Sequence, residues 1–231
     1  MKRMIPLIKI SNREIIDVVK YSPTKAIIVE KKLLSAPGQY TLSCFVLNFE
    51  NGDKEVITKN AYLMKKFGSS FEKITEKIAN YAECDSTILA NRNVLLVFPN
   101  GQLGMFDSDG ELKWTDELSY NEKTVNGLAP DGEYFWSCCM DENCVIRYNA
   151  DNINIDIRVG SNEAKTFIRP SFVSADDNYI YVCCNRAKVR KIDRSNFTVS
   201  DVKEYSDLKK FYKHNEFSII CTSNGCYVDK D

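Results

Sequence analysis

The chain has 231 residues, of which 44% are hydrophobic and 27% are charged, and its formal net charge is −1. This is the composition of an ordinary folded domain, and it excludes a chain that is mainly disordered. No uninterrupted apolar run approaches the roughly 20 residues that a membrane-spanning helix needs, so we expect no membrane association. A charge balance near zero gives no general attraction to nucleic acid, so we expect no nucleic-acid partner.

The amino-terminal segment and the cysteines both point to a reducing compartment. Pro6 and Lys9 interrupt the apolar stretch near the start, which leaves it too short for the core of a signal peptide. The nine cysteines cannot all pair within one chain, because their number is odd. We therefore expect a cytoplasmic protein whose thiols are free.

Two pairs of cysteines are adjacent in the sequence, Cys138-Cys139 and Cys183-Cys184. Zinc sites favour a gap of two residues between thiolates, so this spacing argues against zinc, and we expect no metal and no cofactor. Redox chemistry at the adjacent pairs is the alternative. We favour the interpretation that these cysteines are small buried hydrophobic residues within strands.

The first predicted element is an apolar strand over Lys2–Ile10, and a strand-turn-strand unit then recurs along the chain. Copies of the unit begin at residues 20, 88, 128, 173 and 211. The copy at 128 reads Leu-Ala-Pro-Asp-Gly-Glu-Tyr-Phe-Trp-Ser-Cys-Cys, and it aligns without a gap with Val-Ser-Ala-Asp-Asp-Asn-Tyr-Ile-Tyr-Val-Cys-Cys at 173. Further strands and Asx-rich turns follow, so that the unit holds four short strands in about 40 residues. That period and strand count are those of a propeller blade.

An insertion separates the first copy from the second, and it adds roughly 25 residues to the usual period. We place it at residues 59–83. Within it, Phe71, Ile74 and Ile78 recur at helical spacing, which predicts a short amphipathic helix over about 70–82. A sixth, degenerate blade is the alternative, although the insertion is short for four strands.

The segment from Asn126 to Trp136, with Val145-Ile-Arg-Tyr and a turn after it, resembles a blade of the NHL, YVTN and WD40-like β-propellers. The Trp-Asp and Gly-His dipeptides of WD40 repeats are not present. The resemblance implies an all-β fold and a single β-propeller domain over 1–231. Five units of about 40–45 residues fit a chain of 231, so we expect five four-stranded blades, or six in the alternative. The last copy stops after its third strand. We expect Lys2–Ile10 to supply the fourth strand and close the ring, because an unpaired edge invites aggregation. We expect a monomer.

The loops of such a scaffold are where function concentrates. We expect a non-enzymatic binding or scaffold module that recognises a protein or peptide. The predicted recognition surface is the face that carries the loops between the second and third strands, together with the insertion. Aromatic and charged side chains there are the candidate contacts: Tyr62, Phe67, Phe71, Asp141, Glu142, Arg186 and Lys188.

The alternative function is a small propeller hydrolase or lyase with a site in the central channel, which a metal could assist. The predicted inner strands bring few acidic groups to such a channel, namely Asp17, Glu83 and Asp85. The single histidine, His214, aligns with a turn position of the other copies, and we interpret it as a surface turn residue. We therefore expect no catalytic residue.

Overall fold

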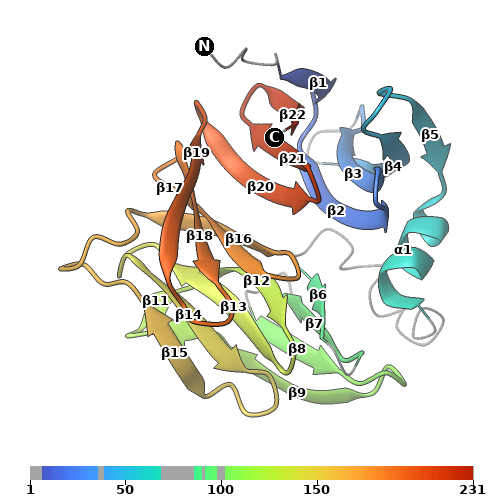
Figure 1. Cartoon of the computed structure of the whole chain (residues 1–231). Coiled ribbons are helices and arrows are strands. Elements are labelled where there is room, and N and C mark those ends of the chain that lie inside the picture. The colour runs from blue at the N-terminus through green and yellow to red at the C-terminus, as the bar shows by residue number, and fades with distance from the viewer. Residues whose placement is uncertain (1–6, 36–38, 69–85, 90–91, 98–101, 231) are drawn as a thin grey trace.

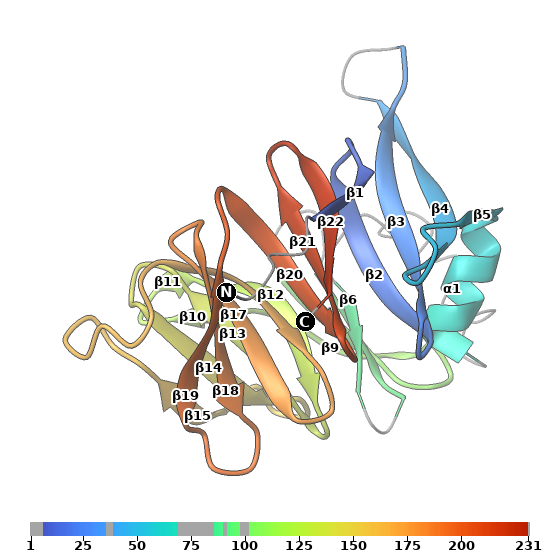
Figure 2. The ribbon, with the colours of Figure 1, turned by 45° about the horizontal axis from the view of Figure 1, so that its top comes forward.

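Five antiparallel sheets of four strands each surround a common axis, so the chain is a five-bladed β-propeller (Figures 1 and 2). The computed structural model describes residues 7–35, 39–68, 86–89, 92–97 and 102–230. The predicted all-β fold and the choice of five blades are confirmed. Each blade runs outward from an inner strand, and a short connection then leads to the next inner strand.

The strands have the following bounds. The first blade contains β2 (Ile15–Ser22), β3 (Lys25–Leu33), β4 (Tyr40–Asn48) and β5 (Lys54–Ile57). The second contains β6 (Ser86–Ile88), β7 (Val94–Val97), β8 (Gln102–Phe106) and β9 (Leu112–Glu117). A small hairpin, β10 (Ser119–Tyr120) and β11 (Lys123–Thr124), leads to the third blade. That blade contains β12 (Asn126–Asp131), β13 (Tyr134–Cys139), β14 (Cys144–Asn149) and β15 (Ile155–Val159). The fourth contains β16 (Pro170–Ala175), β17 (Tyr179–Cys184), β18 (Lys188–Asp193) and β19 (Val199–Glu204). The fifth contains β20 (Leu208–His214), β21 (Phe217–Thr222), β22 (Gly225–Lys230) and β1 (Ile8–Ser11).

The two ends of the chain close the ring together, as the strand count predicted. The strand order of the fifth blade is β1-β22-β21-β20, with Ile8 opposite Val228 and Ser11 opposite Cys226. The amino-terminal strand therefore covers the outer edge that β22 would otherwise expose. Ile10 is buried in the core between the fifth and first blades, so the strand contributes to packing as well as to hydrogen bonding.

Five separate hydrophobic clusters fill the spaces between neighbouring blades. The clusters include Val29 with Leu96, Leu95 with Ile146, Trp136 with Val182, Cys183 with Phe211, and Ile219 with Phe45. An open row of five blades would have four interfaces, whereas a closed ring has five. Each buried aliphatic or aromatic side chain contributes about 1.5–3 kcal/mol, so the fifth interface is a large part of what holds the ring closed.

The adjacent cysteines are explained by this packing. Successive side chains on a strand point to opposite faces, and both faces of a blade meet a neighbouring blade. Cys138 accordingly lies in the cluster between the third and fourth blades, whereas Cys139 lies between the second and third. Cys184 and Cys183 divide in the same way between two interfaces. All eight cysteines of the described residues are free and buried, which confirms their interpretation as small hydrophobic residues.

The insertion begins with a helix that the sequence analysis did not predict. Helix α1 (Lys59–Phe67) starts after Thr58, whose hydroxyl accepts a hydrogen bond from the Ala61 amide at 3.1 Å. It ends at Gly68, which has a φ of 59° and so favours glycine. The predicted helix at 70–82 lies outside the described residues.

Candidate functional site

A cavity of about 690 Å³ lies on the propeller axis, and we call it the axial cavity. All five blades line it, with residues near the carboxyl ends of their inner strands or in the turns that follow. One residue from each blade defines its position: Lys20, Ile88, Pro130, Asp176 and Tyr212. Its volume falls within the range of about 300–1,000 Å³ that is usual for ligand pockets.

The two ends of the propeller differ in which connections they carry. The turns between the first and second strands, such as 132–133, 176–178 and 215–216, form what we call the turn face. The loops between the second and third strands, such as 140–143, lie at the opposite end, which we call the loop face, because adjacent strands are antiparallel. The axial cavity is at the turn face. The predicted recognition surface is the loop face, so the two do not coincide.

The prediction of exposed contact residues is wrong for two of them, because their side chains are buried. Tyr62 is 2% exposed and Phe67 is 7% exposed, and both belong to the cluster between the first and second blades. The physical reason is that α1 packs against these blades and buries its aromatic side chains there. The Tyr62 hydroxyl also donates a hydrogen bond to the Asp17 carboxylate at 2.9 Å. Phe71 lies outside the described residues.

The other four predicted residues lie on the loop face, but much of their charge is already engaged there. Arg186 forms an ion pair with Asp207, and Lys188 forms one with Asp201 at 2.7 Å. The carboxylate of Glu142 accepts a hydrogen bond from the Asn162 amide at 3.3 Å. Asp141 is exposed. The structure therefore does not bring these residues together into one converging site.

The turn position that aligns between the copies has a structural role that the repeat analysis did not identify. In the third blade, the Trp136 indole donates a hydrogen bond to the Asp131 carboxylate at 2.8 Å. In the fourth blade, the Tyr181 hydroxyl donates to the Asp176 carboxylate at 2.6 Å. Each aspartate thus accepts from the aromatic side chain five residues later. This spacing was visible in the aligned copies.

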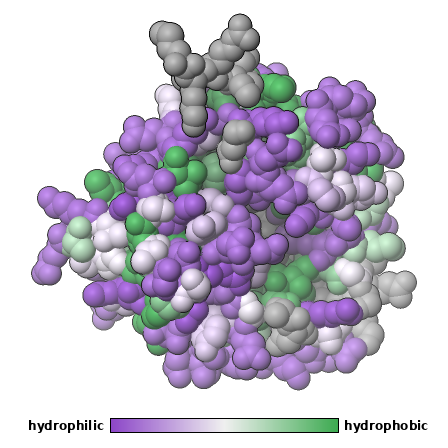
Figure 3. Space-filling model, viewed as in Figure 1, coloured by the Kyte–Doolittle hydropathy of each residue, from purple (hydrophilic) through white to green (hydrophobic). Residues whose placement is uncertain are grey.

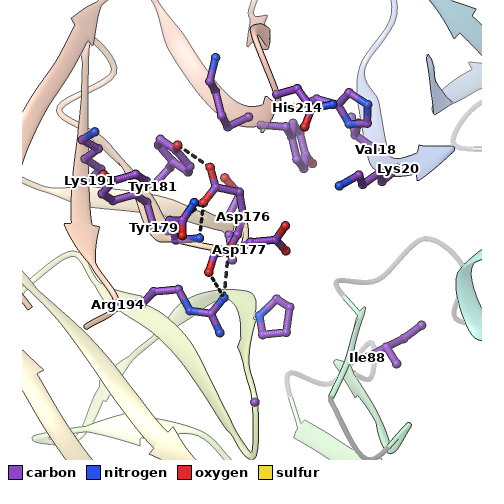
Figure 4. Close-up of a pocket in the computed structure, with 18 of the residues that line it drawn as sticks. Val18, Lys20, Ile88, Asp176, Asp177, Tyr179, Tyr181, Lys191, Arg194 and His214 are labelled. Atoms are coloured by element: carbon purple, nitrogen blue, oxygen red, sulfur yellow. Dashed lines mark hydrogen bonds between the residues drawn. The ribbon is translucent and has the colours of Figure 1, made fainter. Parts of the chain in front are cut away.

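Arg194 connects these two turns across the blade boundary. Its guanidinium donates to the Asp131 carboxylate from Nε at 2.8 Å. It also donates to the carbonyl oxygens of Asp176 and Asp177, at 2.9 and 3.2 Å (Figure 4). Burial alone would raise the pKa of Asp131, but the hydrogen bonds from Trp136 and Arg194 outweigh it, so this pKa lies below its ordinary value. The wall of the cavity at residues 176–178 is therefore held by a charged network.

His214 is buried, not a surface turn residue, which corrects the interpretation from its alignment. Its Nε2–H donates to the carbonyl oxygen of Ser22 at 2.6 Å, and its ring packs against Phe49 at 5.1 Å between centroids. These contacts join the fifth blade to the first. Burial lowers the pKa of His214, and the nearby charges of Lys20 and Lys213 lower it further, against an opposing effect of the Ser22 bond.

We expect the stability of the protein to depend on the protonation of His214. Because the folded pKa lies below the ordinary 6.5, this contribution is fully present above pH 6.5 and is lost as the pH falls through the folded pKa. The wild type should lose stability faster than His214→Gln on acidification, by up to about 1.4 kcal/mol per pH unit. Urea unfolding at about pH 5.5 and about pH 7.5 measures this difference, and equal pH dependence of the two proteins would contradict it. The measurement is specific because the chain has a single histidine.

The acidic residues proposed for a channel enzyme do not form a reactive group in the part of the chain that is described. Asp17 accepts hydrogen bonds from Tyr62 and from the Lys66 amine, so it anchors α1 to β2. Glu83 and Asp85 lie outside the described residues. Among the residues that are placed, no three or more His, Cys, Asp or Glu side chains gather as a metal site would require.

The face shown in Figure 3 is mainly hydrophilic, and its hydrophobic residues form separate small areas. A partner that binds on this side would therefore meet polar and charged groups more than a continuous apolar surface. Within the described residues, no helix has both the length and the apolar character needed to cross a membrane.

The comparisons with known proteins show similarity of fold alone. No family model and no curated protein matches the chain. YCF48 from Cyanidioschyzon merolae is similar at 11% identity, with 94% of this chain and 69% of that chain covered and a TM-score of 0.49. BamB from Moraxella catarrhalis is similar at 13% identity, with 94% and 61% covered and a TM-score of 0.42. Sqt1 from Saccharomyces cerevisiae is similar at 12% identity, with 93% and 58% covered and a TM-score of 0.45. The chain thus spans less than two thirds of the latter two proteins.

Proposed function

We propose that this propeller is a non-catalytic binding module that takes a peptide segment of a partner protein into the axial cavity. The observation that carries the proposal is the cavity itself, to which all five blades contribute. Its lining combines aromatic rings with charged and amide side chains, the mixture that recognises an extended peptide by packing and hydrogen bonding together. The eight thiols of the described residues are free and buried, which supports a reducing compartment, such as the cytoplasm, as the place of this interaction.

The turn face is a better recognition surface than the loop face for a physical reason. Binding gains most from groups that are not already engaged within the protein, because engaged groups must first be separated. Arg186 forms an ion pair with Asp207, which lies between β19 and β20, and Lys188 forms one with Asp201 of β19. At the cavity, by contrast, the Lys191 amine lies 3.8 Å from the centroid of the Tyr179 ring and both side chains are partly exposed. Among the described residues, no ion pair to Lys191 would have to be separated before a ligand binds.

A peptide library selected against the full chain tests the proposal. We expect the enriched peptides to bind the double variant Tyr179→Ala/Lys191→Ala at least about tenfold more weakly than the wild type, measured by fluorescence anisotropy. The double variant Asp141→Ala/Arg186→Ala is the matched control on the loop face and should bind within about twofold of the wild type.

The reverse pattern would contradict the cavity as the site and would restore the loop face. Failure of the library to yield any specific peptide would contradict peptide binding. Urea unfolding of each variant shows whether a loss of affinity comes from a loss of fold.

A further inference from the structure

The charged side chains that line the axial cavity divide into those that the protein itself satisfies and those that it does not. The Asp176 carboxylate accepts hydrogen bonds from the amides of Asn178 and Tyr179, both at 2.8 Å, and from Tyr181. Arg194 is held by Asp131 and by backbone carbonyls. These groups build the wall. Two further cations of the lining also have contacts within the protein: the Lys213 amine donates to the Ser218 hydroxyl at 3.5 Å, and the Lys191 amine lies 3.8 Å from the centroid of the Tyr179 ring.

Lys20 and the side chain of Asp177 are different. Both residues are exposed and line the cavity. Among the residues that the structure places, no hydrogen bond or ion pair engages the Lys20 amine or the Asp177 carboxylate. The Lys20 charge is also close enough to the cavity wall to lower the pKa of His214.

The two side chains come from opposite sides of the cavity. Lys20 lies on β2 of the first blade, and Asp177 lies in the β16–β17 turn of the fourth blade. These blades are not neighbours, since the fifth blade separates them on one side and the second and third on the other. Figure 4 shows Lys20 and Asp177 directed toward the space between these blades. A cationic and an anionic group therefore face one cavity from different blades.

We infer that the axial cavity selects a peptide segment that carries both charges, with a carboxylate bound by Lys20 and a cationic side chain bound by Asp177. The inference rests on the proposed function and names its ligand. Opposite charges on two sides of the cavity orient such a segment. The tyrosine rings of the lining, Tyr179 and Tyr212, supply surface for the part of the peptide between its charges.

Blocked peptides in which a glutamate and a lysine flank glycine spacers of several lengths test the inference. We expect the full chain to bind the best Glu/Lys peptide about tenfold more tightly than the same peptide with Gln in place of Glu, or with Gln in place of Lys. In Lys20→Met, the preference for Glu over Gln should disappear while the preference for Lys remains. In Asp177→Asn, the preference for Lys should disappear while that for Glu remains.

Lys32→Met and Asp141→Asn are the matched controls, because both are exposed and both lie toward the loop face. They should leave all preferences unchanged. The inference is wrong if the wild type binds the charged and neutral peptides equally, or if Lys20→Met and Asp177→Asn weaken every peptide by the same factor. If library peptides are sensitive to Tyr179→Ala/Lys191→Ala but not to Lys20→Met or Asp177→Asn, the proposed function stands and the charge assignment fails.

Discussion

Replacing Gly225 with alanine is expected to destabilise the closed ring by about 2–6 kcal/mol, the sum of a backbone cost and a steric cost. Gly225 begins β22 with a φ of 131°, a conformation that residues with a side chain rarely adopt. A methyl group on Gly225 would overlap the carbonyl oxygen of Ser11, which lies on the closing strand β1. The alanine variant must therefore move β1 away from β22 or deform the hairpin that β22 forms with β21.

Urea unfolding measures the loss in the Gly225→Ala variant, and hydrogen exchange of the β1 amides shows whether the loss is located at the closure. Gly52→Ala is the control. Gly52 has a φ of 77°, and an added methyl group would have no atom within 4 Å, so this variant shows the backbone cost alone, about 1–2 kcal/mol. Equal losses in the two variants would contradict a tight contact between β22 and β1.

The fold could be predicted because its information is local and repeated. The strands of a blade are joined by short turns, so each blade appears in the sequence as a continuous unit with its own turn residues. The closing strand could be predicted for a different reason. The last copy, which ends near Asp229, lacks a fourth strand, and the amino-terminal segment around Ile10 has no blade of its own. Counting strands was sufficient there, because the amino-terminal strand brings the last blade to the four strands of the other blades.

The burial of individual residues could not be predicted where it depends on contacts between blades. Tyr62 and Phe67 are aromatic residues in an insertion, a pattern that fits an exposed binding surface as well as a buried anchor. Their burial follows from the packing of α1 on the first two blades, which no sequence period reveals. His214 aligns with turn residues of the other copies, but it ends β20, and its side chain contacts Ser22 and Phe49, which are adjacent to it only because the ring closes.

The axial cavity was missed for a related reason. Its residues are not close in the sequence: Lys20 and Tyr212 line the same space from opposite ends of the chain. The sequence does show which turn residues occupy equivalent positions in the aligned copies. The alignment of Asp131 with Asp176 placed both residues at the same height in their blades, and hence at the same face. The turn face could have been identified as the convergent one by asking which aligned positions carry polar side chains in several copies.

The Asp131→Ala substitution is expected to cost about 3–5 kcal/mol, because it removes the acceptor of a buried charged network. It leaves the buried Trp136 indole and Arg194 without their carboxylate, whereas Arg147 keeps its ion pair with Asp156. Asp131 is 9% exposed, and it accepts hydrogen bonds from Trp136, from Arg194 and from Arg147, the last at 3.2 Å. Glu216→Ala is the control, because it removes the carboxylate of an exposed ion pair with Lys230 at 3.4 Å, and such pairs contribute only about 0–1 kcal/mol. Urea unfolding measures both losses, and similar values would show that the network adds little.

The same network predicts an acid-sensitive stability and a link to binding. The pKa of Asp131 in the folded protein lies below its ordinary value of 3.8. The contribution of the ionised Asp131 to the free energy of unfolding is therefore present above about pH 4 and is lost as the pH falls through the folded pKa. Asp131→Asn should lack this part of the acid dependence while keeping an acceptor for Trp136.

The Asp131→Asn substitution also removes the charge that binds Arg194, which donates to the carbonyl oxygens of Asp176 and Asp177. In a folded Asp131→Asn variant, peptide affinity should therefore fall although residue 131 does not line the cavity. Unchanged affinity in that variant would show that the network stabilises the blades without positioning Asp177.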